Sequence, residues 1–180
     1  RKQRSDGAEA RGHLLLAALR LFAEKGISQV NISDLALEAG VARGTIYNNV
    51  ETMEQLFAQI ATQLSAEMHV RVKNSIESLD DPAQRLANGM RFFIRRAHDE
   101  PHWGAFMTRF ALSNSALREL FSSQATTDVL NGLASGRYSF RQEQIVNVVS
   151  LIATSALGSM FLVQEGLRTW RDAGSDSAEF

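Results

Sequence analysis

The chain has 180 residues and a formal net charge of −1, and 44% of the residues are hydrophobic. This length and composition allow one or two small domains with a real core, and with only 2 prolines long helices are the expected structure. The 0 cysteines exclude disulfides and cysteine-based metal or nucleophile sites. This agrees with a reducing compartment, and we expect a cytoplasmic protein. A nearly neutral chain is not a basic coat for nucleic acid, so any contact with DNA must come from a local patch.

Residues 1–10 are polar and charged, and they predict a flexible arm whose basic side chains either follow DNA phosphates or lie in solvent. The sequence shows no secretory signal here and does not begin with Met, so we expect a trimmed chain. A first helix is expected over residues 11–25, because apolar residues recur at helical spacing between Leu15 and Phe22. Gly26 is expected to end it.

Residues 32–50, ISDLALEAGVARGTIYNNV, predict two short helices joined by a tight turn at Ala39-Gly40-Val41. Asn31 is the expected cap of the first helix, and Asp34, three residues later, completes a variant of the capping box. The second helix is expected over about residues 42–49. This is the pattern of a helix-turn-helix, in which the second helix enters the major groove of DNA.

The outward face of the second helix has hydrogen-bond donors and acceptors but no acidic group, while Ile46 and Val50 point inward. Arg suits guanine, Asn suits adenine and Thr offers a methyl or a hydroxyl group, whereas Tyr and a helix N-terminus suit phosphate oxygens. An ordinary solvated face is the alternative, but Asn and Gly are poor helix formers, so stability does not explain them. The residues expected to bind DNA are Asn31, Ser33, Ala42, Arg43, Gly44, Thr45, Tyr47, Asn48, Asn49 and Thr52.

Residues 14–57 resemble the N-terminal domain of the tetracycline-repressor (TetR) family of transcriptional regulators. The matching features are Ala18, Leu21-Phe22, Gly26, Leu35-Ala36, Ala39-Gly40-Val41, Gly44-Thr45-Ile46-Tyr47 and Leu56. The resemblance implies an all-helical homodimer, in which a three-helix DNA-binding domain precedes a variable ligand-binding domain.

Three residues depart from the usual pattern of that family. Ala42 stands where Ser usually precedes the recognition helix, Val50 where an aromatic residue usually follows it, and Met53 where a Lys usually contacts phosphate. Loss of the cap costs ~0.5–2 kcal/mol, and one hypothesis is that a DNA phosphate caps the helix instead. Phosphate binding is then expected to depend more on Arg43, Tyr47 and the arm.

The next helices follow from start signals and apolar spacing. Thr52 and Gln55 predict a capping box for a helix roughly 40 Å long at ~1.5 Å per residue, long enough to connect the two domains and to transmit a tilt. Asp81-Pro82 and Pro101 mark later helix starts. The helices are expected over about residues 52–78, 81–99, 101–112 and 115–136.

The stretch from Gln144 to Gln164 contains no charged residue, and a helix that is apolar on every side is buried on every side. Ser139 and Gln142 are expected to form its capping box. One stripe is expected to face the core: Ile145, Val149, Ile152, Ala156 and Met160. A second stripe, whose small residues allow close helix approach, is expected to form a dimer interface: Val148, Leu151, Ser155, Gly158 and Leu162. A transmembrane helix is the rival interpretation because the length suits it, but the polar residues and the lack of a basic flank argue against it.

Gly166 and Gly174 are expected to break the chain after this stretch, and residues 176–179 to begin a last helix. The family resemblance implies one more helix in this region, so we expect part of the dimer interface to lie beyond Phe180.

A cluster of aromatic and Met residues predicts an apolar ligand pocket, although each such residue taken singly is more often plain core. The expected lining is Leu64, Met68, Phe93, Trp103, Phe106, Met107, Phe110 and Met160. Arg96 and Arg109 are expected to be surface charges, with the alternative that they pair an acidic group inside. His98 and His102 have a metal-binding spacing if helical, but Pro101 separates them, so we expect no metal and no other cofactor.

Together these features predict an all-α protein with a helix-turn-helix DNA-binding domain over residues 1–51 and a helical ligand-binding and dimerisation domain over residues 52–180. We expect a transcriptional regulator, a repressor rather than an activator, that binds a palindromic double-stranded DNA operator as a homodimer. A small, largely apolar effector is expected to release it. The alternative is a DNA-bound regulator or scaffold that a protein partner controls, with no small-molecule effector. An all-α enzyme is disfavoured because no catalytic constellation stands out.

Overall fold

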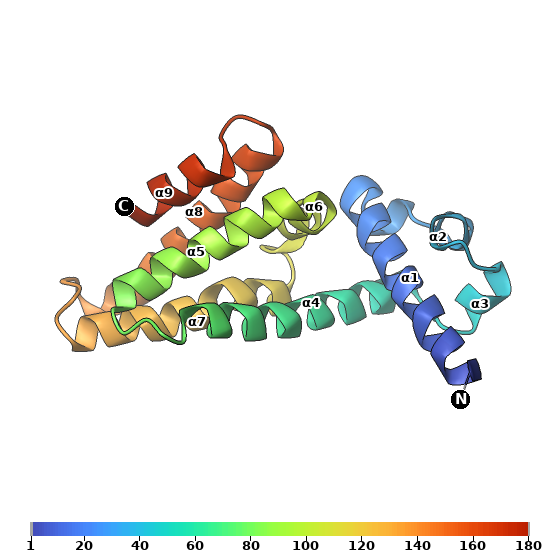
Figure 1. The fold of residues 1–180 in the computed structure, drawn as a ribbon, viewed down its shortest axis with the longest axis horizontal. Coiled ribbons are helices and arrows are strands. Elements are labelled where there is room, and N and C mark those ends of the chain that lie inside the picture. Colours follow the sequence, from blue (N-terminus) through green and yellow to red (C-terminus); the bar gives the residue numbers. More distant parts are fainter. Residues whose placement is uncertain (1, 180) are drawn as a thin grey trace. The chain divides into compact units, whose positions relative to one another are not determined.

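The computed structural model describes the backbone of residues 2–179 and the side chains of residues 10–178 (Figure 1). The chain forms two compact units, residues 1–63 and residues 64–180. The division falls within α4 (Met53–Ile76), so this one helix belongs to both units. All regular elements of the described residues are helices, as predicted for an all-α protein.

The first unit contains α1 (Lys2–Lys25), the short 3-10 turn η1 (Ile27–Gln29), α2 (Ile32–Ala39), α3 (Arg43–Tyr47) and the beginning of α4. The helix α1 ends at Lys25 as predicted but begins at Lys2, so residues 2–10 continue the helix where an arm is expected. These residues include helix formers such as Ala and Glu, and a single Gly does not stop a helix. They lack an apolar stripe, and for that reason periodicity does not reveal them.

The core of the first unit confirms the predicted inward faces. Ala18, Phe22, Leu35 and Ile46 are fully buried. The ring of Phe57 on α4 packs edge-on against Phe22, with the ring centroids 6.0 Å apart. The helices α2 and α3 therefore pack on a buried apolar core.

The turn between α2 and α3 depends on Gly40. This residue has φ 65°, in the left-handed region that glycine adopts at little cost. The geometry lets Val41 N donate to Ala36 O at 3.1 Å and so ends α2. The predicted turn at Ala39-Gly40-Val41 is confirmed.

The second unit contains the end of α4, α5 (Pro82–Asp99), α6 (Pro101–Phe110), α7 (Ser115–Ala134), η2 (Gln142–Gln144), α8 (Ile145–Gln164) and α9 (Trp170–Glu179). The helix α5 is central, because it packs against α6, α7, α8 and α9 (Figure 1). The Asp81 side chain accepts from Ala83 N at 3.1 Å, which confirms the predicted start of α5. Asn114 caps α7 in the same way, accepting from Leu117 N at 3.1 Å.

Two predicted helix starts near the C-terminus are wrong. The helix α8 begins at Ile145, and the side chain that supports its entry is Gln144, which accepts from Arg141 N at 3.0 Å; Ser139 is not the cap. The helix α9 begins at Trp170 rather than at 176, because the Thr169 hydroxyl accepts from Asp172 N at 3.1 Å. Hydroxyl and amide caps recur in this stretch of sequence, so local pattern alone did not select the right ones.

Gly174 lies inside α9 and does not break it, contrary to the prediction. A Cβ atom on this residue would stand 3.3 Å from Arg91 Cγ on α5. The missing side chain therefore allows α9 to approach α5 closely.

The helix α8 is buried on one side. Val149, Ala156 and Met160 of the predicted core stripe are buried, whereas Val146 and Leu151 are 78% and 69% exposed. The segment Gln142–Gln164 is long and apolar enough to cross a membrane, the one such segment among the described residues. A core helix meets the same criterion, and α8 packs against α5, α6, α7 and α9. In one copy of the chain its other face is uncovered.

Candidate functional site

The polar side chains of α3 point outward, and the apolar residues on its other face are buried. Ile46 is fully buried and Val50 is buried after the helix, whereas Tyr47 is 68% exposed. Arg43 is also exposed, and its side chain makes no hydrogen bond or ion pair with any residue that the structure describes. An exposed guanidinium and an exposed phenol four residues apart on one helix can form new bonds to an external partner.

The two acidic side chains on the neighbouring α2 are paired with α1. Lys25 Nζ lies 3.5 Å from Asp34 Oδ1, and Arg20 Nη1 lies 3.5 Å from Glu38 Oε1. Both pairs lie at the surface and contribute little stability, but each offsets one negative charge of α2. Sequence reasoning missed these pairs because the partners lie on different helices.

The predicted capping box at the start of α2 is confirmed. Asp34 N donates to Asn31 Oδ1 at 3.0 Å, and Asn31 N donates to Asp34 Oδ2 at 3.3 Å. At α4, Gln55 N donates to the Thr52 hydroxyl at 3.1 Å. These caps fix the helix ends on either side of α3.

The predicted DNA-binding residues of the α2–α3 element and its borders lie at the surface. Thr45 is half-buried and the other nine are exposed: Asn31, Ser33, Ala42, Arg43, Gly44, Tyr47, Asn48, Asn49 and Thr52. The helix α3 is shorter than predicted, so Asn48 and Asn49 lie in the turn after it. Asn49 Nδ2 donates to Thr45 O at 2.7 Å. Ala42 gives α3 no side-chain cap, as expected from its methyl group.

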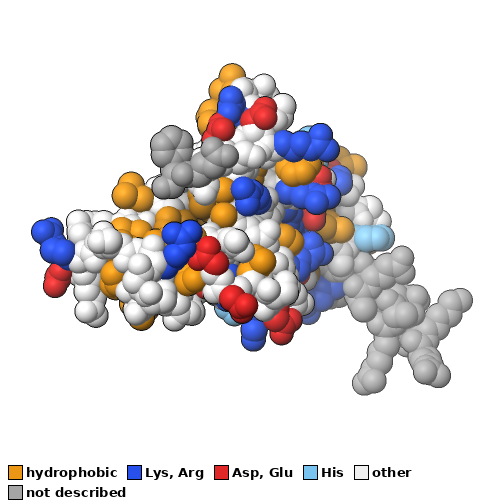
Figure 2. All heavy atoms as spheres, turned by 60° about the vertical axis from the view of Figure 1, so that its left-hand side comes forward, with side chains coloured by type: hydrophobic (Ala, Val, Ile, Leu, Met, Phe, Trp, Pro, Cys, Tyr) orange, Lys and Arg blue, Asp and Glu red, His pale blue; other side chains and the backbone are white. Residues whose placement is uncertain are grey.

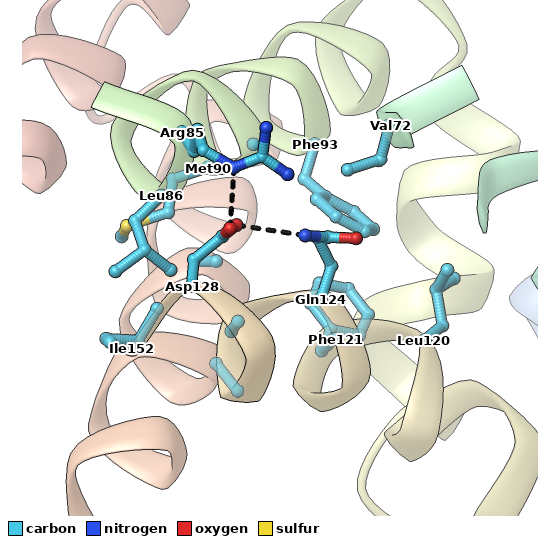
Figure 3. A pocket seen from close by; sticks show the side chains of 14 residues that line it. Val72, Arg85, Leu86, Met90, Phe93, Leu120, Phe121, Gln124, Asp128 and Ile152 are labelled. Carbon is cyan, nitrogen blue, oxygen red and sulfur yellow. Dashed lines mark hydrogen bonds and ion pairs between the residues drawn. The ribbon is translucent and has the colours of Figure 1, made fainter. Parts of the chain in front are cut away.

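A cavity of about 40 Å³ lies in the second unit between α4, α5, α7 and α8 (Figure 3). Its walls are mainly aliphatic and aromatic, and the rings of Phe93 and Phe121 stack with centroids 4.4 Å apart. The polar part of the wall is Arg85, Asp128 and Gln124. The full lining is Val72, Arg85, Leu86, Gly89, Met90, Phe93, Leu120, Phe121, Gln124, Ala125, Asp128, Ile152, Ala153 and Ala156.

Arg85 joins the polar wall of this cavity to the end of α4. Its Nε donates to Asp128 Oδ1 at 2.7 Å, and its Nη1 donates to Ile76 O at 2.9 Å and to Leu79 O at 3.1 Å. Gln124 Nε2 donates to Asp128 Oδ2 at 3.1 Å. A buried carboxylate is stable only when it is paired in this way, so the cavity and the last turn of α4 share one network.

A larger open groove, about 690 Å³, adjoins the cavity. The two hollows share the side chains of Leu86, Met90 and Ile152. Figure 2 brings this end of α5, α7 and α8 forward and shows hydrophobic side chains reaching the surface there. The groove is lined by Ala83, Leu86, Ala87, Met90, Val129, Arg137, Tyr138, Phe140, Val148, Leu151, Ile152, Ser155, Ser177 and Ala178.

One edge of the groove is formed by Tyr138 and by an exposed ion pair. Arg137 Nε donates to Asp81 Oδ1 at 3.0 Å, and this bond together with the Ala83 N–H holds the pKa of Asp81 below its ordinary value. Burial raises the pKa of Tyr138. Its ring covers Gly132, where a Cβ atom would collide with it.

Most of the predicted pocket residues form packed core, and one of them lines this cavity. Phe93 lines the cavity, and Leu64 and Phe110 are half-buried. The remaining five are buried against other side chains: Met68, Trp103, Phe106, Met107 and Met160. Aromatic and Met content marks apolar interior, but it does not distinguish a filled interior from a hollow one.

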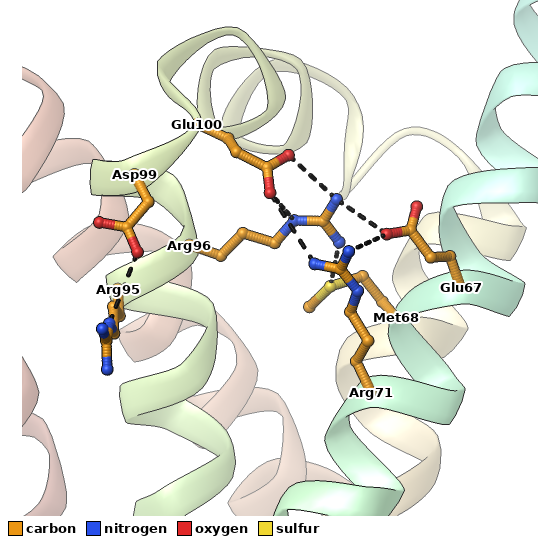
Figure 4. Close-up of polar contacts among 7 residues, drawn as sticks. All are labelled: Glu67, Met68, Arg71, Arg95, Arg96, Asp99 and Glu100. Carbon is orange, nitrogen blue, oxygen red and sulfur yellow. Dashed lines mark hydrogen bonds and ion pairs between the residues drawn. The ribbon is translucent and has the colours of Figure 1, made fainter. Parts of the chain in front are cut away.

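The prediction that Arg96 is a surface charge is wrong. Arg96 is 6% exposed, and its Nη2 donates to Glu67 Oε1 at 3.2 Å and to Glu100 Oε2 at 3.1 Å (Figure 4). Its guanidinium carbon lies 4.6 Å from the centroid of Trp103. Arg71 pairs with the same two carboxylates, at 3.0 and 3.8 Å. This network fastens the second half of α4 to the junction of α5 and α6.

The second stripe of α8 is mostly uncovered in the single chain. Val148 is half-buried, whereas Leu151, Ser155, Gly158 and Leu162 are exposed. Among the described residues, no atom outside the helix lies within 4 Å of the place that a Cβ on Gly158 would take. The stripe therefore offers an apolar surface with room for close approach of another helix.

Comparison with known proteins agrees with the predicted family. Residues 14–60 match the model of "Bacterial regulatory proteins, tetR family", and residues 81–178, more than half of the chain, match "Tetracyclin repressor-like, C-terminal domain". The HTH-type transcriptional regulator AcrR of Shigella flexneri is 40% identical over 60 residues, which are 33% of this chain and 28% of that protein. The chain thus aligns with less than a third of AcrR.

Solved structures show the same fold over almost the whole chain. The transcriptional regulator FadR of Bacillus subtilis, in complex with stearoyl-CoA, superposes with a TM-score of 0.80 and 17% identity over 94% of this chain and 96% of that one. A tetR family transcription regulator from Shewanella sp. PV-4 gives a TM-score of 0.78 and 21% identity over 93% of each chain. With both halves of the chain matched by the models of one family, the protein belongs to the tetR family of bacterial regulatory proteins.

Proposed function

We propose that this protein is a transcriptional repressor that binds a palindromic DNA operator as a homodimer and that a small, largely apolar effector releases it. The observation that supports DNA binding best is the free Arg43 guanidinium beside the exposed Tyr47 on α3. The two acids Asp34 and Glu38 of α2 are paired with bases of α1. In this proposal Arg43 and Asn48 contact bases, while Tyr47 and Thr52 contact phosphates.

The dimer in this proposal forms through the second stripe of α8. Isologous two-fold contact covers the same patch on both copies, and the exposed Leu151 and Leu162 supply the apolar area. Gly158 at its middle permits close packing of α8 against its equivalent. The dimer would hold two α3 helices about 34–36 Å apart, the separation of successive major grooves.

The effector site in this proposal is the cavity together with the part of the adjoining groove next to Leu86, Met90 and Ile152. Val148, Leu151 and Ser155 form the α8 rim of that groove and belong to the dimer stripe, so the partner protomer would close the groove along this rim. The relative FadR was solved with stearoyl-CoA, which supports ligand binding in this fold. Arg85 links the cavity to the carbonyl of Ile76, the last residue of α4, and to that of Leu79 just after it, and α4 continues into the first unit. An effector that binds one position of α4 more tightly than another would shift the population between them and so change the spacing of the α3 helices.

Selection of genomic DNA fragments on the purified protein tests DNA binding. A specific operator should be recovered, and its affinity should fall steeply as salt is raised, because neutralised phosphates release counterions. Recovery of no specific fragment, or an affinity that does not respond to salt, would contradict the proposal.

The alternative, control by a protein partner without a small effector, draws support from the small cavity, about 40 Å³ in this state. A thermal-shift screen with metabolites separates the two. A stabilising metabolite that also releases operator DNA supports the effector. DNA binding that no metabolite alters, together with co-purification of a defined partner, supports the alternative.

A further inference from the structure

The polar wall of the cavity contains a carboxylate that can accept more bonds than it does. Asp128 is 1% exposed and accepts from Arg85 Nε at 2.7 Å and from Gln124 Nε2 at 3.1 Å (Figure 3). A carboxylate has about four acceptor positions, and these bonds use two of them. Asp128 can therefore accept a further hydrogen bond from a molecule that enters the cavity.

The charge of this wall is balanced, and this balance discriminates between ligand classes. An anionic head group would approach Arg85 beside the like charge of Asp128. A cationic head group would have to displace the Arg85 guanidinium, which also donates to Ile76 O and Leu79 O. A neutral hydroxyl requires neither change. It donates to an ionised acceptor, and such a bond is stronger than one between neutral groups.

The groove has space for the rest of the ligand, and three side chains separate it from the cavity. Leu86, Met90 and Ile152 line both the cavity and the groove of about 690 Å³, and in Figure 3 they lie together on one side of Asp128. Met is unbranched and adapts readily to new packing. Once these side chains move aside, the joined hollow falls in the range of roughly 300–1,000 Å³ typical of ligand pockets.

We propose that the effector is an uncharged, largely apolar molecule with a hydroxyl group that donates to Asp128, while its apolar body passes between Leu86, Met90 and Ile152 into the groove. This inference rests on the function proposed above and names the chemical class of the effector. Arg85 would share Asp128 with the ligand, and it also donates to the carbonyl at the end of α4. Binding of the ligand would therefore alter the hydrogen bonds at that helix end.

Three probes with the same eight-carbon body test the head-group preference: 1-octanol, octylammonium and octanoate. Isothermal titration at pH 7.5 on the full chain without DNA should show octanol binding at least about 10-fold more tightly than either ion, a difference of ~1.4 kcal/mol. Tightest binding of octanoate or of octylammonium overturns the proposal. Equal binding of all three also overturns it, because Asp128 then does not read the head group.

Single-residue variants test whether octanol binds at Asp128 and Leu86. Asp128→Asn should weaken octanol binding about 10-fold, because the acceptor loses its charge. Asp99→Asn is the matched control, since Asp99 also pairs with an arginine but lies outside the linings of both the cavity and the groove; it should leave octanol binding unchanged. Leu86→Trp fills the shared wall and should abolish binding, which tests the route even if Asp128→Asn does not fold. Unchanged octanol affinity in folded Asp128→Asn or in Leu86→Trp overturns the proposal. Operator binding is measured separately, so its absence would refute the proposed function without altering the octanol ranking.

Discussion

Truncation of Leu151 should dissociate the proposed dimer. Leu151 is 69% exposed in the single chain, and complete burial of a Leu side chain is worth about 1.5–3 kcal/mol. Covering the exposed two-thirds therefore contributes roughly 1–2 kcal/mol in each copy. A two-fold interface contains the residue twice, and Ala keeps part of the contact. Leu151→Ala is then expected to cost about 2–3 kcal/mol per dimer, which raises the dimer dissociation constant roughly 30- to 150-fold.

Sedimentation equilibrium over a range of protein concentrations measures this constant. Leu112→Ala is the matched control, because Leu112 is 61% exposed but lies after α6 and outside the α8 stripe. Leu151→Asp should leave monomer at all accessible concentrations and should also weaken operator binding, since the operator needs two linked α3 helices. Equal dissociation constants for the wild type and Leu151→Ala would refute the placement of the interface on α8. The same effect in Leu112→Ala would show that the loss is not specific to that stripe.

Further predictions concern the DNA face, a helix cap, an acid-sensitive ion pair and the buried ion pair. Arg43→Ala should weaken operator binding by about 1–3 kcal/mol if the guanidinium reads a base; unchanged fluorescence anisotropy titrations would exclude it from the interface. Ala42→Ser should stabilise the free protein by about 0.5–2 kcal/mol in urea unfolding, because a hydroxyl here can cap α3; no gain in the free energy of unfolding would mean that a side-chain cap does not stabilise α3. The arginine partner of Asp81 and a backbone N–H hold the pKa of Asp81 below 3.8, so its stabilising effect is present above about pH 4 and lost as the pH falls further. Asp81→Asn should flatten that part of the acid-unfolding curve, and an identical curve would contradict the linkage. Arg85→Met should destabilise the protein by about 3–5 kcal/mol, because Asp128 stays buried without its counter-charge; adding Asp128→Asn should recover part of the loss, whereas additive losses would contradict the coupling.

Short-range patterns predicted most of the helix boundaries. The Asn31–Asp34 capping box, the left-handed Gly40 and the Asp81 cap each depend on residues within a few positions of one another. Their hydrogen bonds form within one turn, so both partners are close together in the sequence and can be recognised there. The outward position of Arg43 and the inward position of Ile46 follow from helical periodicity in the same way.

Local sequence pattern predicted helix ends wrongly where several residues could each begin or end a helix. Ser139 and Thr169 are both hydroxyl residues before polar segments, yet Thr169 caps a helix and Ser139 does not. Gly174 has the composition of a helix break, but the close packing of α9 on α5 gives it a place inside a helix. Tertiary contact decided between these possibilities.

By itself, the sequence determined the all-helical fold, the helix-turn-helix with its exposed face, and an uncharged helix α8 with one stripe suited to the core. The tertiary structure alone decided which charges meet and where space is left. Arg96 is buried because two carboxylates from α4 and from the end of α5 converge on it, and the acids of α2 are neutralised by bases of α1. The cavity lies beside Asp128 and Arg85 and has only Phe93 in common with the predicted pocket residues. The physical reason is that residue type sets whether a side chain leaves water, whereas the packing of distant helices sets what it touches and which gaps remain unfilled.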